Sequence, residues 1–96
     1  MKKESLKYNE KVFKALSAYV RLEIIEYLGS GEKTVGDIAD FIKRDISTVS
    51  KHLSTLKNAE LIDYRKNGKH VFYFITKRCV ISFIDCISSS CGGDGC

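Results

Sequence analysis

Apolar residues follow a helical period in five segments of the chain. Their spacing predicts helices over 8–16, over 18–28, from Thr34 to Phe41 or Ile42, over 46–58, and from 76 or 77 to about 88. Between the fourth and fifth helices, two runs of β-branched and aromatic residues, 61–65 and 70–75, predict strands. The pattern therefore predicts a mainly α fold that carries a β-hairpin.

Polar residues at the helix boundaries support this segmentation. Ser17 is placed to cap the second helix, which the glycine-containing segment 29–31 then ends. Thr34 and Asp37 have the spacing of a capping box, and Asp45 is placed to cap the fourth helix. The third and fourth helices are thus expected to be short and joined by a tight connection.

The hairpin has the clearest local signal in the chain. Asn67-Gly68 lies between its two strands, and this dipeptide supplies the positive φ values that a type I′ turn requires. Two short helices followed by such a hairpin are typical of a winged helix-turn-helix, which fits the major groove of DNA. The hairpin would be the wing.

Composition and charge indicate a small folded domain with a basic centre. The chain has 96 residues, 44% of them hydrophobic, and no apolar run approaches the roughly 18 residues that span a membrane. No apolar segment follows the first lysines, so no secretory signal is expected and we expect a cytoplasmic protein. Seven basic and three acidic residues lie between Lys43 and His70, which accounts for the whole net charge of +4. This is the distribution that phosphate binding requires.

The fourth helix is the candidate recognition helix. Val49, Leu53 and Leu56 form its apolar stripe, and its remaining surface is rich in hydroxyl groups, which are weak helix formers. We predict that this helix and the wing contact DNA and that a dimer reads an inverted repeat. The predicted contacts on the helix are Ser47, Thr48, Ser50, Lys51 and His52, and those on the wing are Arg65, Lys66, Lys69 and His70.

Several segments resemble one known family. They are Ala15-Leu-Ser-Ala-Tyr-Val-Arg-Leu-Glu-Ile-Ile, Thr34-Val-Gly-Asp-Ile-Ala, Ser47-Thr-Val-Ser-Lys-His-Leu and Gly68-Lys-His-Val-Phe-Tyr. Over roughly residues 8 to 88 the chain resembles the ArsR/SmtB family of bacterial and archaeal repressors. The resemblance implies a dimeric winged helix-turn-helix that leaves its operator when a metal, metalloid or oxidant binds. A short chain and the unpartnered stripe of the last helix indicate that the dimer forms through the first and last helices.

The chain departs from the sensing sites of that family. Two cysteines one residue apart mark the third helix of arsenic and cadmium members, but those positions are Thr34 and Gly36 here. The Asp/His/His/Glu zinc set of the last helix has no counterpart, since both histidines lie in the DNA-binding half. The Asp-Pro pair often found before the arginine of the second helix is also missing. Neither familiar sensing site is present.

The cysteines at 79, 86, 91 and 96 are the remaining candidates. Two thiolates that share an ion lie at most about 4.6 Å apart, whereas seven helical residues between Cys79 and Cys86 rise about 10.5 Å. Cys86, Cys91 and Cys96 are joined by short segments rich in serine and glycine and could converge. Three soft ligands favour As(III), Sb(III) or Cd(II) over oxygen-seeking ions. Zn(II) is also possible, with Cys79 of the partner subunit as a fourth ligand, although Cys79 alone is more typical of a small core residue.

Two alternatives accompany this hypothesis. Cys91 and Cys96 could instead form a disulfide, which would make the protein a redox-sensing repressor. The winged helix could also be a protein-interaction module with a metal-binding tail. An enzyme is not expected, because the chain has no nucleophile-base pair, paired carboxylates or glycine-rich phosphate loop. The expected organisation is a DNA-binding and dimerisation domain over 1–88 and a flexible tail over 89–96.

Overall fold

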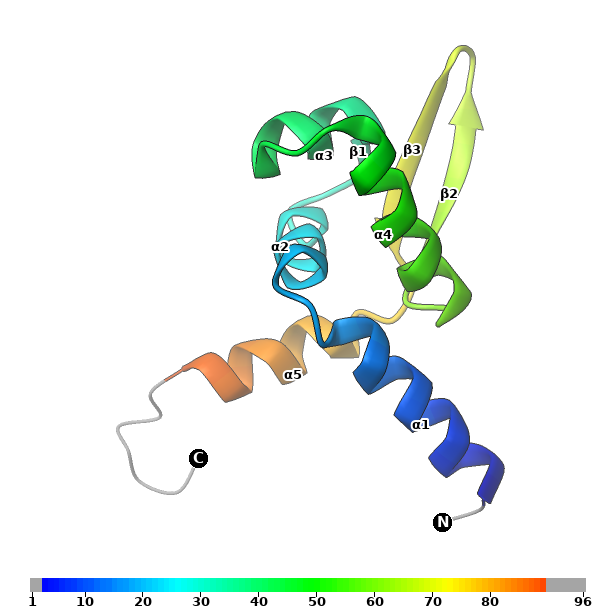
Figure 1. The fold of residues 1–96 in the computed structure, drawn as a ribbon, viewed down its shortest axis with the longest axis vertical. Helices are drawn as coiled ribbons and strands as arrows, with labels where there is room; N and C mark the ends of the chain where they lie inside the picture. Colours follow the sequence, from blue (N-terminus) through cyan, green and yellow to red (C-terminus); the bar gives the residue numbers. More distant parts are fainter. Residues whose placement is uncertain (1–2, 90–96) are drawn as a thin grey trace.

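The computed structural model describes residues 3–89 and has the predicted architecture (Figure 1). Five helices and a small sheet are present in these residues. In chain order the elements are α1 (Lys3–Leu16), α2 (Tyr19–Leu28), β1 (Lys33–Thr34), α3 (Val35–Ile42), α4 (Ile46–Asn58), β2 (Ile62–Asn67), β3 (His70–Ile75) and α5 (Cys79–Ser88). The expectation of a mainly α winged helix-turn-helix is confirmed.

The sheet has three antiparallel strands in the order β1-β3-β2. The sequence did not predict β1, because two residues are too few to show an alternating pattern. Asn67 pairs with His70 across the hairpin, so the two turn residues are Gly68 and Lys69. Of these only Gly68 has a positive φ, 66°, which fits a type II′ turn. The predicted type I′ turn centred on Asn67-Gly68 was therefore wrong by one residue.

The core lies between α2, α3, α4 and the base of the hairpin. Its largest fully buried side chains are Ile24, Ile25, Leu28, Ile38, Val49, Leu53, Leu56, Leu61 and Ile62. The predicted apolar stripe of α4 supplies three of them, and α3 supplies one. Apolar burial therefore fixes one side of the recognition helix, which leaves its polar face outward.

Two predicted helix starts were wrong for reasons that involve hydrogen bonds. Ser17 Oγ donates to the Lys14 carbonyl at 2.8 Å, at the end of α1. Ala18 is the extended residue before α2, and no side chain caps that helix. The last helix begins at Cys79 rather than at 76 or 77, because the amide of Thr76 donates to the Leu61 carbonyl at 3.0 Å. Thr76 thus continues the pairing of the hairpin base.

The first helix is longer than predicted. It begins at Lys3, five residues before Tyr8, because charged residues favour helix without adding to an apolar stripe. Figure 1 shows α1 and α5 diverging on the side of the molecule opposite α3 and the tip of the wing. Within residues 3–89 no helix has both the length and the apolar character needed to cross a membrane.

Candidate nucleic-acid interface

The first turn of α4 is organised around the Asp45 carboxylate. This carboxylate accepts from the Thr48 amide at 3.2 Å and from the Thr48 hydroxyl at 2.7 Å, and it also accepts a short hydrogen bond from the Ser47 hydroxyl. Hydrogen bonds from Ser47 and then Thr48 lower the pKa of Asp45 to about 2. The predicted cap is confirmed, and the hydroxyls of Ser47 and Thr48 are both engaged by it.

The outer face of α4 is exposed around Ser50 and Lys51. Because Val49 and Leu53 on the opposite side are fully buried, this orientation is fixed by the core. Ser47 is also exposed, whereas Thr48 is half-buried. These positions form a polar surface that begins at the helix N-terminus, where the helix dipole favours anions and hydrogen-bond acceptors.

His52 differs from the other predicted contacts on α4 because it is half-buried against α2. Its Nδ1 lies 3.1 Å from Arg21 Nη1, and since arginine only donates, Nδ1 must accept. Burial, with smaller contributions from the positive charges of Arg21 and Arg44, lowers the pKa of His52. Arg21 also donates to the Lys14 and Ala15 carbonyls, so the histidine is part of a link between α1, α2 and α4.

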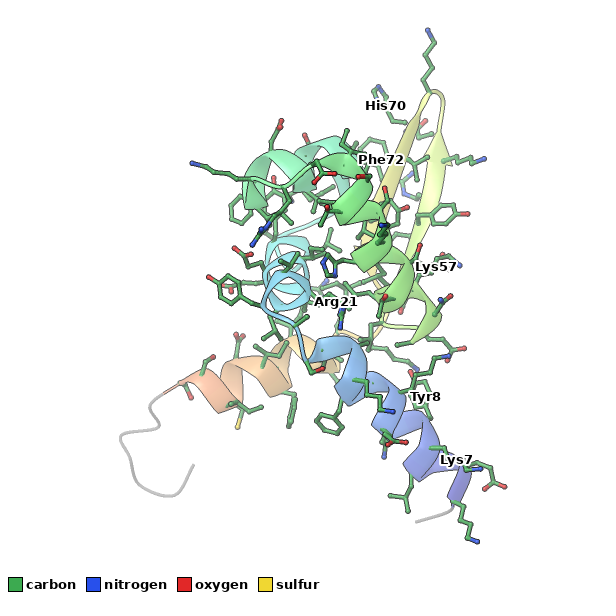
Figure 2. All side chains as sticks on the ribbon, in the orientation of Figure 1. Lys7, Tyr8, Arg21, Lys57, His70 and Phe72 are labelled. Atoms are coloured by element: carbon green, nitrogen blue, oxygen red, sulfur yellow. The ribbon has the colours of Figure 1, made fainter. Side chains whose placement is uncertain are left out.

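The predicted wing contacts lie on both faces of the hairpin. Lys66 lies on the same face as Tyr64 and the buried Ile62, since side chains alternate along a strand. Arg65 lies on the opposite, outer face, and so does His70 on β3. Lys69 occupies the tip, and Figure 2 shows His70 near the same end of the wing. The structure thus separates these residues into two faces and a tip, a distinction that their positions in sequence did not provide.

Arg65 has an intramolecular partner. Its guanidinium donates to both carboxylate oxygens of Glu32, at 2.7 Å and 3.2 Å, and this pairing raises the pKa of Arg65. A DNA phosphate would have to replace the Glu32 carboxylate as the hydrogen-bond acceptor before the Arg65 guanidinium could bind DNA fully. Lys66, Lys69 and His70 are exposed.

A second basic surface was missed by the sequence analysis. A hollow of about 490 Å³ between α1 and α4 is lined by the cations Lys7, Lys11, Lys14 and Arg21 and by Glu10, Thr55 and Asn58. Figure 2 shows Lys7 toward the N-terminal end of α1 and Arg21 beside α4. The lysines were overlooked because acidic residues elsewhere in the chain balance their charge. Their spacing of four and then three residues, which places them on one helical face, was the available signal.

Of the four cysteines, the described residues contain Cys79 and Cys86, at opposite ends of an intact α5. Cys79 lines an apolar hollow of about 350 Å³ together with Phe13 and Phe83. Cys86 is exposed. Cys91 and Cys96 lie outside the described residues, so the predicted three-thiolate site and the predicted tail are not described. Within residues 3–89 no three histidine, cysteine or acidic side chains are grouped closely enough to hold a metal ion.

Comparisons with known proteins agree with this architecture. Residues 20–64 match the family described as "Bacterial regulatory protein, arsR family". A cadmium resistance transcriptional regulatory protein CadC homolog of Staphylococcus aureus is 47% identical over 64 residues, covering 66% of this chain, which spans about half (53%) of that relative. The transcriptional repressor SdpR of Bacillus subtilis is 39% identical over 62 residues, covering 65% of this chain and 69% of SdpR.

Solved structures give the same result. One neighbour is a homodimeric winged helix-turn-helix DNA-binding domain, Mb0332 of Mycobacterium bovis, described as a possible ArsR-family transcriptional regulator. It aligns with a TM-score of 0.85 and 27% identity over 91% of this chain and 83% of that chain. The fold and the sequence together define the class of protein as a winged helix-turn-helix transcriptional regulator.

Within that class, the chain belongs to the arsR family of regulatory proteins. The predicted family is therefore confirmed. It is a family of regulators, so the expectation that the chain is not an enzyme is also confirmed.

Proposed function

We propose that this protein is a homodimeric DNA-binding repressor that leaves its operator when a thiophilic metal or metalloid binds its C-terminal cysteines. The main supporting observation is the exposed polar face of α4, held beside a wing with exposed cations. The names of the relatives, a cadmium resistance regulator and a repressor, point the same way. Such a repressor acts in the cytoplasm, where its operator lies.

The DNA-binding surface consists of α4 and the wing. Ser47, Thr48 and Ser50 would face base edges, while Lys51 on the helix and Lys69 at the tip would bind phosphates. Two such surfaces in a dimer would read an inverted repeat with half-site centres about 34 Å apart. His52 and Arg65 would contribute mainly by positioning α4 and the wing, given their intramolecular bonds.

The salt dependence of operator binding tests this surface. Binding of a duplex from the protein's own upstream region is measured at several salt concentrations for the wild type, Lys51→Gln and Lys69→Gln. Each lost phosphate contact should flatten the slope of log K against log salt by about 0.9. Lys3→Gln, at the far end of α1, is the control for loss of one charge. Equal slopes in all four proteins, or no binding by the wild type at low salt, would reject the proposal.

The apolar surface between α1 and α5 fits a second copy of the chain. The rings of Phe13 on α1 and Phe83 on α5 meet edge to face at 5.9 Å, yet they are 56% and 44% exposed. The Mb0332 domain, which shares this fold, is homodimeric. Burial of two large aromatic residues per subunit would add to the limited core that a chain this short can form alone.

Sedimentation equilibrium tests the dimer. Phe83→Glu should shift the protein to monomer and abolish operator binding while the helical content remains. Phe41→Glu is the matched control, because Phe41 is also exposed, at 57% against 44% for Phe83, but stacks on Tyr27. A Phe83→Glu protein that stays dimeric would show that another surface forms the dimer.

The sensing site is proposed to contain Cys86, Cys91 and Cys96, with residues 89–96 as the segment that closes over the ion. Cys86 is three residues from Phe83 and lies on the same helical face, so an ion held there would lie beside the proposed dimer contact. Ion binding could then change the spacing of the two recognition helices. A difference of a few kcal/mol between the two dimer arrangements is enough to empty the operator.

Native mass spectrometry and mobility shift test the sensing site together. The reduced dimer is titrated with As(III), which we favour, and with Sb(III), Cd(II) and Zn(II). One ion per site and release of the operator are expected for the wild type and for Cys79→Ser, and neither is expected for Cys86→Ser. Release by an oxidant with a mass loss of two hydrogens, without ion binding, would favour the disulfide mechanism instead.

A further inference from the structure

The two hydroxyl side chains in the first turn of α4, those of Ser47 and Thr48, offer an outside partner hydrogen-bond acceptors only. Asp45 Oδ1 accepts from the Thr48 hydroxyl at 2.7 Å, and Oδ2 accepts from the Thr48 amide at 3.2 Å and from the Ser47 hydroxyl. An ionised carboxylate cannot donate, so both hydroxyl protons are committed to it. Each of the two hydroxyl oxygens therefore keeps lone pairs, but no proton, for a further partner.

These protons are expected to stay on the Asp45 side when DNA binds. A hydrogen bond to a charged acceptor is roughly twice as strong as one to a neutral acceptor. A hydroxyl that turned to donate to a base carbonyl would exchange the stronger bond for the weaker one. It would also leave part of a carboxylate unsatisfied in a groove from which water is excluded, which carries a further cost.

We propose that this turn selects base edges that donate hydrogen bonds, namely the N6 amino group of adenine or the N4 amino group of cytosine. This inference rests on the proposed DNA-binding function. In the major groove guanine presents N7 and O6 and thymine presents O4, all of them acceptors. Those edges could form no hydrogen bond with the Ser47 and Thr48 oxygens, because both sides would be acceptors. The same reasoning excludes phosphate as the partner of these hydroxyls, so phosphate contacts fall to nearby cations such as Lys51.

Base analogues in the operator test the selection. In a duplex from the protein's own upstream region, each half-site adenine is replaced by purine, which lacks the amino group, or by 7-deazaadenine, which keeps it. Each cytosine is replaced by pyrimidin-2-one, which lacks the N4 amino group. At one or more positions, loss of the amino group should weaken wild-type binding about tenfold, while 7-deazaadenine should have little effect.

Variants of the turn assign that effect to its residues. The penalty for the missing amino group should fall below about twofold in Ser47→Ala or Thr48→Val. Ser54→Ala, which removes an exposed hydroxyl from the same helix away from Asp45, should retain the full penalty. Asp45→Asn keeps a capping side chain but removes the charge, so the hydroxyls can donate, and it should accept guanine or thymine at the same position.

The outcomes separate this inference from the proposed function. If the wild type binds its operator but the positions sensitive to Ser47→Ala or Thr48→Val carry guanine or thymine edges, the selection is wrong and DNA binding stands. The same holds if Asp45→Asn leaves base preference unchanged. If the wild type binds no duplex from its upstream region, both are wrong.

Discussion

Glu32 and Arg65 are joined across the outer face of the sheet although they lie 33 positions apart in the chain. Glu32 precedes β1 and Arg65 lies on β2, and these strands are separated by β3. On β3, the Phe72 ring lies beneath the Arg65 guanidinium, whose carbon is 5.7 Å from the ring centre. The ion pair therefore ties the wing to the start of α3, so that Arg65 acts as a link within the sheet.

This arrangement predicts that Glu32→Ala and Arg65→Ala weaken operator binding in the same direction, by roughly fivefold or less, because both loosen the wing. Amide hydrogen exchange in β2 and β3 should become faster in both variants. Glu4→Ala, which removes one exposed carboxylate far from the wing, should change neither property. Tighter binding by Glu32→Ala would instead identify Arg65 as a direct phosphate contact that Glu32 restrains.

The contact between Arg21 and His52 predicts a loss of stability in mild acid. Burial and the two nearby arginines lower the pKa of His52 from 6.5, so above about pH 6.5 both folded and unfolded forms are neutral. As the pH falls below that value, the unfolded chain binds a proton first, and the free energy of unfolding decreases. Urea unfolding at about pH 5.5 and about pH 7.5 measures the difference. The difference in the free energy of unfolding between the two pH values should shrink in His52→Gln but persist in His70→Gln.

The sequence predicted the elements whose signals are local. The capping box of Thr34 and Asp37 and the Asp45 cap depend on residues three positions apart, and both were predicted correctly. Helix α4 was predicted with its observed bounds because its apolar stripe covers about two turns and its first turn carries a cap. By contrast, the Ser17 hydroxyl could accept from an amide at the start of α2 or donate to a carbonyl at the end of α1. It donates to the Lys14 carbonyl, and the local sequence does not decide between these two bonds.

The candidate site was predictable as a surface but not as a set of contacts. His52 and Arg65 have partners 31 and 33 residues away, and no local pattern reveals such pairs. The lysines of α1 form a basic surface next to the recognition helix only because α4 packs beside α1 in the folded chain. Local spacing therefore identified the recognition helix and the wing, whereas tertiary packing determines which of their side chains are available to DNA.

Backbone strain after α4 predicts a stabilising substitution. Glu60 has φ 63°, a left-handed conformation that costs a residue with a Cβ atom roughly 1–2 kcal/mol. Glycine adopts this conformation freely but loses more entropy on folding, so Glu60→Gly should raise the free energy of unfolding by about 1 kcal/mol. Urea unfolding at neutral pH measures it. Glu60→Ala is the control, since it removes the carboxylate but keeps the strain and should give no gain.

The basic hollow between α1 and α4 predicts that the DNA interface extends beyond α4. Within residues 3–89 the salt bridges are those of Lys14 with Glu10 and of Arg65 with Glu32, so Lys7 and Lys11 are not neutralised by a described carboxylate. Ser47, Lys51, Thr55 and Asn58 form one stripe on α4 that is about 16 Å long and ends at this hollow. The major groove is about 12 Å wide, so the end of the stripe would meet the backbone at its edge.

The combined variant Lys7→Gln with Lys11→Gln should therefore flatten the salt dependence of operator binding by about 0.9 for each lost contact. The ratio of specific to non-specific affinity should stay constant, because phosphate contacts carry no sequence information. Lys3→Gln with Lys33→Gln removes the same charge outside the hollow and should preserve the wild-type slope. If both double variants reduce the slope equally, the effect reflects net charge alone and the hollow makes no contact with DNA.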